Sequence, residues 1–449
     1  MLGLRKNSSS VGYDPNYIVG LDLGTTKITV VVAEYDPINI EAHIIGTGQA
    51  SSQGIRKGLI VNLEKAVTAV KEAIYEAENM AGPDIKDVIV SFSGSDIQSV
   101  RTKGAISLGH SPREVRKLDI ERVIEAAQLN TVIPPNKTLL HTIPVEYSLD
   151  DNSGIDDPLG MTGTRLNINL ESVIVPSAVI QNVYNCVTRA GLDVSGFVIK
   201  PLASALGALT PEESAAGAVC ADIGGGTSGI AIFKDGRPQH LSVIAIGGDH
   251  ITNDVALILK IPNGKAEDIK KEANVSSADD SNSIDKLEFE YNDRSYSYSI
   301  SQLNDVVRDR IEELMLSLVK PEIAASSVGG LPGGIILTGG VAMCSGVDEF
   351  ISHTMDMPVR IANPLDTNSM YPGRNGPEYS CAGGIIRYAI ERERDPRRYI
   401  TPDIDELIQT AKPALNKGKP WHDGEQEPER KPRGISIIDT IKDAFRDLF

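Results

Sequence analysis

The sequence of 449 residues is long enough for several domains with sizeable buried cores, and 41% of it is hydrophobic, as in ordinary globular proteins. Its 61 acidic and 44 basic side chains leave a net charge of −17, which argues against broad contact with the phosphates of nucleic acid. The four cysteines lack zinc-ligand spacing, and neither a signal peptide nor the ~18 consecutive apolar residues of a membrane span occur, so we expect a soluble or peripheral protein of the reducing cytosol.

The first predicted elements are a β-hairpin and a helix. Residues 17–34 form an apolar run that only residues 24–27, Gly-Thr-Thr-Lys, interrupt, so we expect two strands joined by a tight polar turn. The apolar side chains of residues 63–81 recur about every 3.6 residues, which predicts a helix. Gly82 and Pro83 follow and predict its end.

A separate inserted subdomain is expected from about residue 84 to residue 165. This region alternates strand-like runs at residues 85–92 and 138–147 with a charged helix at residues 111–129.

The opening pattern then returns. Helix, strand and helix are predicted at residues 177–190, 194–199 and 201–209. Residues 218–233 again read as strand, polar turn and strand, 200 residues after the first copy. This repeat predicts two similar α/β halves that face each other across a cleft.

A second insertion is expected at residues 249–328. It contains a hairpin around Asn292 and Asp293 and a helix at residues 303–323. The last predicted elements are a strand at residues 335–338, a helix at residues 381–393 and, with six prolines, a flexible tether at residues 395–433.

The two polar turns carry groups that suit a phosphate chain. Glycines let backbone N–H groups approach phosphate oxygens, threonine hydroxyls donate, and Lys27 neutralises charge. Asp22 and Asp222 would place one carboxylate from each turn near a Mg²⁺ ion, and Asp222 is also the candidate catalytic residue. Each turn alone is more simply a hairpin, but the two matched copies together with a third stretch, residues 333–341, favour a clamp around a triphosphate. The candidate residues are Asp22, Gly24, Thr25, Thr26 and Lys27 in the first turn, and Asp222, Gly224, Gly225, Gly226 and Thr227 in the second.

A third stretch, residues 333–341, predicts an apolar strand that delivers paired glycines. At Gly339 and Gly340, followed by Val341, a flat base would stack on bare backbone; the alternative is that these glycines only let a helix pack closely.

Two further patterns have competing interpretations. Glu267 and Lys270 lie three residues apart on a predicted helix and would reach ribose and base, although such a pair alone is more often a solvated ion pair. Residues 224–229 also fit the G-x-G-x-x-G dinucleotide pattern, but a strand-like run follows where that pattern requires a helix, so we reject it.

Residues 434–449 predict a terminal amphipathic helix. Sixteen residues give ~24 Å of helix, too short to span a bilayer but able to lie flat in its interface. The alternative is a helix docked on the core, and the proline-rich tether favours the membrane. The apolar residues are Ile435, Ile438, Ile441, Phe445, Leu448 and Phe449.

Four stretches, in this order and spacing, resemble the first phosphate, connecting, second phosphate and adenosine motifs of the actin, Hsp70 and sugar-kinase superfamily: residues 22–27, 200–209, 222–228 and 334–343. Within this superfamily, Lys27 after Gly-Thr-Thr, residues 54–58 (Gly-Ile-Arg-Lys-Gly) and the insertion at residues 84–165 resemble the FtsA family of bacterial cell division proteins.

This resemblance implies an α/β, actin-like two-lobed fold of duplicated ribonuclease-H-like domains, with an inserted 1C subdomain and a C-terminal amphipathic helix. It implies ATP and Mg²⁺ in the cleft, self-assembly into filaments, other division proteins bound to 1C, and the FtsZ C-terminal peptide bound by the second insertion, where Arg310 and Glu313 carry over. The implied subdomains are 1A at residues 16–84, 1C at 85–164, the rest of 1A at 165–200 with 380–394, 2A at 201–248, 2B at 249–330, the rest of 2A at 331–379, a flexible linker at 395–433 and a membrane helix at 434–449.

The implied function is to tether FtsZ filaments to the cytoplasmic face of the cell membrane at the division septum. Alternatives are a pilus-assembly ATP-binding protein resembling FtsA and a small-molecule kinase, which would need a catalytic aspartate beside a polar sugar pocket, and no such pair can be assigned. One residue departs from the superfamily pattern: Lys200 stands where several ATP-hydrolysing relatives place a carboxylate or amide that positions water. We therefore expect slow ATP hydrolysis at most.

Overall fold

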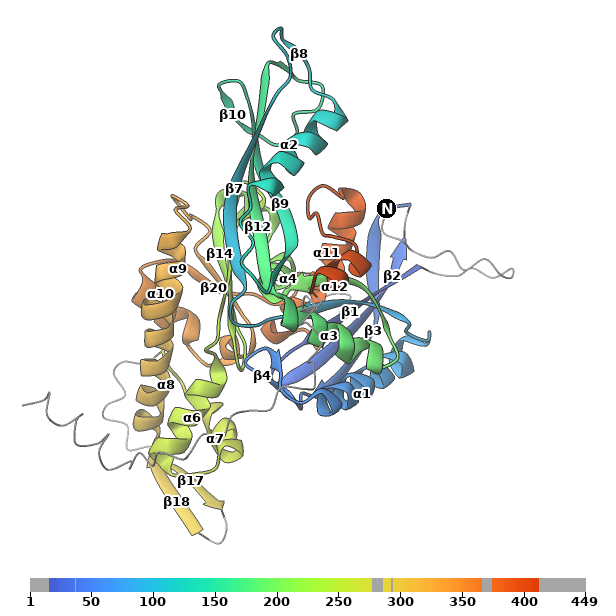
Figure 1. Ribbon diagram of the computed structural model, residues 1–449. Helices are drawn as coiled ribbons and strands as arrows, with labels where there is room; N and C mark the ends of the chain where they lie inside the picture. The colour runs from blue at the N-terminus through green and yellow to red at the C-terminus, as the bar shows by residue number, and fades with distance from the viewer. Residues whose placement is uncertain (1–15, 37, 277–285, 292–293, 366–373, 412–449) are drawn as a thin grey trace, which may run out of the picture. The chain divides into compact units, whose positions relative to one another are not determined.

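Two five-stranded sheets with the same strand pattern organise the structure, a computed structural model that describes residues 16–36, 38–276, 286–291, 294–365 and 374–411 (Figure 1). The strand orders are β3-β2-β1-β6-β13 and β16-β15-β14-β19-β20. In each sheet the first three strands of this order are antiparallel neighbours. The last two strands run parallel to the third strand of the order, β1 or β14. This repeat confirms the predicted α/β fold of two duplicated halves.

The two opening hairpins match the predicted strand-turn-strand runs. Their strands are apolar almost throughout because both faces of each sheet are covered. The first sheet consists of β1 (Asn16–Leu23), β2 (Lys27–Asp36), β3 (Glu41–Ser51), β6 (Asp87–Phe92) and β13 (Asp193–Ile199). The second consists of β14 (Ala218–Ile223), β15 (Ser228–Lys234), β16 (Arg237–Ile244), β19 (Ile335–Thr338) and β20 (Val359–Ile361).

Helices cover both faces of the first sheet. On β2, Val30 and Val32 belong to the core that includes helix α1 (Leu63–Ala81), whereas Val31 contacts helix α11 (Ser380–Arg394) on the opposite face. Helix α1 ends at Gly82, whose φ of 96° suits glycine, so the predicted stop is confirmed. Helix α3 (Ser177–Arg189) packs beside α1, as Figure 1 shows.

The two halves are joined by a close helix pair. Helix α4 (Lys200–Ala208) packs on β14 and β15 of the second sheet, and it also packs on α11, which lies against the first sheet. The backbones approach so closely that a methyl group at Gly384 would lie 1.7 Å from the carbonyl oxygen of Ala203. Glycine at this position therefore sets the contact between the halves.

The first insertion is a four-stranded sheet with its own core under helix α2 (Lys117–Leu129). Its strands, in sheet order, are β10 (Asn152–Ile155), β9 (Lys137–Leu149), β12 (Arg165–Pro176) and β7 (Gln98–Ser107). The predicted bounds of 85–164 are therefore wrong at both ends, because β6 belongs to the first sheet and β12 to the insertion. Alternating apolar patterns predicted strands there but not which strands would pair.

The predicted helix at residues 111–129 begins later than expected. Strand β8 (Arg113–Glu114) pairs with β11 (Thr162–Gly163), so the chain is extended there. Helix α2 starts after Arg116, whose backbone N–H donates to the Asp119 carboxylate at 2.9 Å.

The second insertion packs helices and a hairpin on the second half. The predicted hairpin is present as β17 (Lys286–Tyr291) and β18 (Arg294–Ser299). The predicted helix at residues 303–323 is interrupted: α8 (Ile300–Leu314) leads into a π-helical turn (Met315–Val319) and then α9 (Lys320–Ala325). Pro321 has no N–H group, and in a regular α-helix its ring would clash with the carbonyl four residues earlier, which lies inside that turn. The other helices of this half are α5 (Pro211–Ala216), α6 (Gly248–Leu259), α7 (Asn263–Lys270) and α10 (Val347–Met355).

The chain stays folded beyond the expected start of the linker at residue 395. Thr142 of β9 and Ile400 exchange two backbone hydrogen bonds of 2.8 and 3.0 Å. Helix α12 (Ile404–Ala411) then buries Leu407 and Ile408 against the first half. The prediction of a flexible linker is therefore wrong for residues 404–411. These residues form a short amphipathic helix, and the many prolines and charges around them outweighed this pattern in the prediction.

The predicted membrane helix at residues 434–449 and the linker from residue 412 onward lie outside the described residues. Among the residues that are described, no helix combines the length and the apolar character needed to cross a membrane.

Candidate functional site

Polar side chains gather where three parallel strands of the first sheet end. β1 ends next to Asp22, β6 ends next to Ser91, and Lys200 directly follows β13. Lys200 Nζ lies 2.8 Å from Asp22 Oδ1 and 3.0 Å from Asp22 Oδ2, and Ser91 Oγ donates to Asp22 Oδ1 at 2.5 Å. Carboxyl ends of parallel strands are the usual place for a ligand in an open α/β sheet.

The Asp22–Lys200 ion pair is nearly buried. The side chains of Asp22 and Lys200 are 7% and 15% exposed. Burial alone would lower the pKa of Lys200, but the nearby negative charges, Asp22 first, outweigh it and raise this pKa above its ordinary value. Lys200 therefore keeps its proton at all physiological pH values. The sequence predicted Asp22 as a site residue and singled out Lys200 as a departure from the superfamily pattern, but it gave no signal that these two residues pair, and none for Ser91.

The second sheet supplies a matching carboxylate. Asp222, at the end of β14, accepts a hydrogen bond of 2.5 Å from Ser204 Oγ of α4. Burial raises the pKa of Asp222, and the positive charge of Lys200 opposes this rise. The backbone of Gly339 passes so close that a methyl group there would lie 2.4 Å from Asp222 Oδ1. The predicted carboxylate and the predicted paired glycines are therefore brought together.

The two polar turns face each other. A methyl group added to Gly225 would lie 2.2 Å from Thr26 Oγ1, and one added to Gly226 would lie 2.7 Å from Thr25 Oγ1. The turns therefore touch directly, and the glycines leave no side chain between them. A phosphate chain held between the turns would require them to separate.

Residues 54–58 contact the first turn, and Lys57 also approaches the second. The backbone N–H of Gly58 donates to Thr25 Oγ1 at 3.2 Å. A methyl group at Gly226 would lie 3.0 Å from the backbone nitrogen of Lys57. This loop is a small hairpin of β4 (Ile55–Arg56) and β5 (Leu59–Ile60), and it adds backbone donors beside the turns.

Lys27 points to a neighbouring segment rather than to Asp22. Its ammonium lies 3.5 Å from the ring centroid of Tyr379 and 3.8 Å from Glu378 Oε1. Burial lowers the pKa of Lys27 to about 8, although Glu378 and Asp22 act in the opposite direction. The sequence gave no signal for Tyr379 and Glu378, which lie 352 and 351 residues further along the chain.

The third predicted stretch lies beside the predicted Glu267–Lys270 pair. A methyl group at Gly248 would lie 3.2 Å from Val341 Cγ2 and 3.5 Å from Lys270 Nζ. Lys270 Nζ donates to Glu267 Oε2 at 2.6 Å and to Thr252 Oγ1 at 3.0 Å. The helix carrying this pair is therefore next to the predicted base-stacking glycines. A methyl group on one of them, Gly340, would meet nothing within 4 Å.

The carboxylates suit a Mg²⁺ ion only in part. Within the described ranges, no group of three or more His, Cys, Asp or Glu side chains could hold a metal ion. Mg²⁺ usually needs only one or two carboxylates when phosphates and water complete its shell, which Asp22 and Asp222 satisfy. However, the ammonium of Lys200 already neutralises the carboxylate of Asp22.

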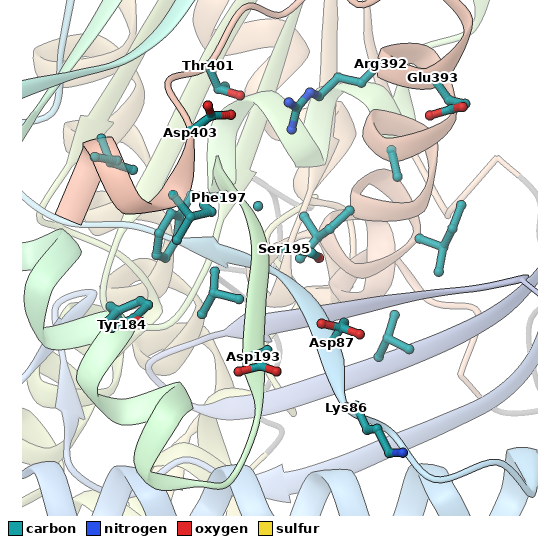
Figure 2. A pocket seen from close by; sticks show the side chains of 18 of the residues that line it. Lys86, Asp87, Tyr184, Asp193, Ser195, Phe197, Arg392, Glu393, Thr401 and Asp403 are labelled. Atoms are coloured by element: carbon teal, nitrogen blue, oxygen red, sulfur yellow. The ribbon is translucent and has the colours of Figure 1, made fainter. Parts of the chain in front are cut away.

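A groove of about 1510 Å³ lies at the opposite ends of the same strands (Figure 2). It is lined by Asp87 at the start of β6, Asp193 at the start of β13, Arg392 of α11, and Thr401 and Asp403 after α11. It contains none of the predicted site residues. The candidate site is at the two turns, because glycines, donors and carboxylates converge there and the strands' carboxyl ends meet there.

The predicted peptide-binding residues lie on the second insertion, away from the turns. Arg310 of α8 donates to both carboxylate oxygens of Asp254 on α6, at 2.6 and 3.1 Å, and to Glu313 Oε2 at 2.5 Å. Leu257 and Ile258 of α6 are 76% and 55% exposed. The structure thus brings Arg310 and Glu313 together, and it adds Asp254 as a partner for which the sequence carries no local signal.

Known proteins resemble this chain over most of its length. Residues 94–174 match the family model described as "SHS2 domain inserted in FTSA", and residues 219–384 match "Cell division protein FtsA". The cell division protein FtsA of Pseudomonas aeruginosa is 36% identical over 385 residues, covering 84% of this chain and 90% of that protein. The Bacillus subtilis protein of the same name is 30% identical over 419 residues, covering 93% of each chain.

Solved structures support the fold independently. A chain of the "PilM-PilN type IV pilus biogenesis complex" aligns with a TM-score of 0.56, covering 83% of this chain and 98% of that chain. Only 16% of the aligned residues are identical, so this likeness concerns the fold alone.

Proposed function

We propose, from the premise that this chain belongs to the FtsA family of cell division proteins, that it binds ATP between its two polar turns and links filaments to the membrane during division. The actin-like fold of the family, with its inserted SHS2 domain, is the one found here. Because the chain belongs to this family, we do not propose the two alternatives, a pilus-assembly protein and a small-molecule kinase.

One observation supports the nucleotide proposal most strongly. Two glycine-rich turns from equivalent hairpins of the two sheets face each other, and each is preceded by a buried carboxylate, Asp22 or Asp222. Backbone N–H groups of such turns bind phosphate oxygens, and threonine hydroxyls add donors. Lys27 would neutralise further charge by leaving Glu378. Lys200 already neutralises Asp22, so Asp22 and Asp222 would meet a Mg²⁺ ion that accompanies the phosphates only through water.

The nucleoside would occupy the neighbouring surface. Gly339 and Gly340 offer bare backbone to a flat base, while Glu267 and Lys270 are close enough to Val341 to meet the sugar and base edges. Helices α6 and α7 are part of the second insertion, so a nucleotide bound here would contact that insertion.

ATP serves here as a conformational ligand, with slow hydrolysis at most. Lys200 occupies the position from which relatives orient water, and its ammonium has no lone pair to accept a proton. The other carboxylate near the site that could accept a proton from water is Asp222, and it already accepts a hydrogen bond from Ser204. Because the turns already touch, ATP would instead act by separating them and thus changing how the two halves meet.

A peptide partner is proposed for the second insertion: the C-terminal peptide of FtsZ. Arg310 pairs with Asp254 and Glu313, so an incoming carboxylate would exchange with one of these partners. Leu257 and Ile258 present apolar surface one helical turn from Asp254. An acidic peptide with apolar side chains matches this combination of charge and surface.

The membrane link is proposed for residues 434–449. Their apolar residues at helical spacing would insert into the interface, while Asp439, Asp443 and Asp447 offset nearby cations, so a single helix binds only modestly. Filament formation would multiply this affinity through avidity. The protein would then act on the cytoplasmic face of the membrane, at the division septum, where other division proteins bind the inserted subdomain.

The membrane proposal is tested by liposome co-sedimentation. Full-length protein is compared with protein that ends at Arg433, each with and without ATP and Mg²⁺. We expect only the full-length form to pellet, in an amount that changes with ATP, and we expect Phe445→Glu to stay in the supernatant. Equal sedimentation of the truncated form would show that the tail is not the anchor.

A further inference from the structure

The carboxylate of Asp22 already has a cation. Lys200 Nζ contacts both of its oxygens, at 2.8 and 3.0 Å, and Ser91 donates to Oδ1. Cys381 Sγ lies 3.4 Å from the same oxygen. Both oxygens therefore have protein partners before any ligand arrives.

Lys200 balances the charge of Asp22 without a metal ion. Lys200 also interacts electrostatically with Asp222, whereas Lys27 lies 3.8 Å from Glu378 Oε1 and so already has a partner. A site with two unpaired carboxylates would repel a triphosphate strongly and bind it only with a divalent cation. Here, the ammonium of Lys200 performs that neutralisation.

We propose that Lys200 is the built-in counter-cation of Asp22, and that it makes nucleotide binding at this site largely independent of Mg²⁺. This inference rests on the proposed function, because it assigns the role of one residue in the proposed ATP site. Lys200 follows β13 at the carboxyl end of the sheet, and a methyl group at Gly24 in the first turn would lie 3.6 Å from its Nζ. Its ammonium is therefore beside the backbone that would bind phosphate.

A purely structural ion pair would give a different result. In that case Lys200 would stabilise the fold, and nucleotide affinity would depend on Mg²⁺ to the same degree with or without the lysine. The readout that separates the two roles is therefore the ratio of affinities with and without Mg²⁺, not the affinity itself.

The experiment measures binding of a fluorescent ATP analogue to full-length protein, in excess Mg²⁺ and in EDTA. For the wild type we expect the two dissociation constants to agree within about threefold. For Lys200→Gln we expect binding in EDTA to weaken by about tenfold or more relative to Mg²⁺, since Asp22 is then uncompensated. Lys200→Arg, which keeps the charge, should retain the wild-type ratio.

Lys27→Gln is the matched control, because this lysine contacts Glu378 and Tyr379 and not Asp22. It should weaken binding by the same factor in both buffers. A wild-type ratio above about tenfold, or equal ratios for wild type and Lys200→Gln, would overturn the inference while leaving ATP binding intact. Should Lys200→Gln fail to fold, the wild-type ratio still decides. No wild-type binding in either buffer would overturn the proposed ATP site itself, and this inference with it.

Discussion

Lys200 Nζ lies 2.8 Å from Asp22 Oδ1, although the two residues are 178 positions apart in the sequence. They meet because β1 and β13 both run parallel to β6 and end at the same edge of the first sheet. Both side chains are at least 85% buried, so neither charge is well solvated without the other. The candidate site is therefore also a determinant of stability.

Removing one charge of this pair should destabilise the protein. We expect Lys200→Gln to lower the free energy of unfolding by about 3 to 5 kcal/mol, because it leaves a buried carboxylate uncompensated. Asp22→Asn combined with Lys200→Gln should lose much less than the sum of the single changes. Urea denaturation of the four proteins measures this coupling. Strictly additive losses would show that the two residues do not stabilise each other.

Lys27 should make nucleotide binding sensitive to alkaline pH. Because burial lowers its folded-state pKa from 10.5 to about 8, its ammonium is lost as the pH rises from 7 to 9. We expect the affinity for an ATP analogue to fall by about tenfold over this range, since one charged contact disappears.

Lys27→Arg, which stays protonated, is the matched control and should bind with little dependence on pH. The same shift has a consequence for stability. Between pH 8 and 10.5 the folded protein binds fewer protons at Lys27 than the unfolded chain, so this residue's contribution to stability rises with pH in that window. An equal pH dependence of affinity in both proteins would contradict the assignment of Lys27 to the phosphate site.

Glu171 should weaken the fold as the pH rises towards neutral. This side chain of β12 is 2% exposed, accepts a hydrogen bond from Ser99, and lies 3.4 Å from Arg101 Nε. Burial raises its pKa from 4.5 to about 7, against the opposing charges of Arg101 and His240. The folded state therefore binds the extra proton between pH 4.5 and 7, and stability falls across this window by on the order of 3 kcal/mol.

Glu171→Gln should accordingly melt at a higher temperature than the wild type at pH 8, with little difference at pH 4.5. Thermal unfolding followed by circular dichroism measures this, and Glu121→Gln, on the exposed side of α2, serves as the control. A constant offset between Glu171→Gln and wild type at both pH values would rule out a titrating carboxyl.

Helix α12 should be part of the folded body rather than of the linker. Leu407 is 1% exposed and packs in the core of the first half, so Leu407→Ala should cost about 2 to 5 kcal/mol. Glu406→Ala, one residue earlier and exposed, is the control. Chains ending at residue 412 and at residue 403 provide a second measurement. Equal melting temperatures for these two chains would show that α12 contributes nothing to the fold.

Local sequence patterns predicted the elements well where packing agrees with the pattern. The hairpin turns at Gly24 and Gly224 follow from apolar runs broken by a few polar residues, and the end of α1 follows from Gly82. The strand partners could not be predicted, because alternation of apolar and polar residues identifies a strand but not the sheet to which it belongs. This is why β6 and β12 were assigned to the wrong sides of the insertion boundaries.

The residues of the candidate site also divide into those that local sequence patterns predicted and those that they did not. Asp22 and Asp222 were predicted because each lies next to a glycine-rich turn. Ser91, Ser204 and Lys200 bind them through contacts that only the pairing of distant strands creates. A single serine at the end of an apolar run carries no local signal of this kind.

The most direct test of the ATP proposal is a crystal structure of the full chain with a non-hydrolysable ATP analogue. We predict phosphate density between residues 24–27 and 224–227, with the turns further apart than the direct contact of Gly225 and Thr26 seen here. The base should lie against Gly340. A nucleotide bound instead in the groove beside Asp87 and Arg392, at the other ends of the strands, would contradict the assignment of the two turns as the ATP site.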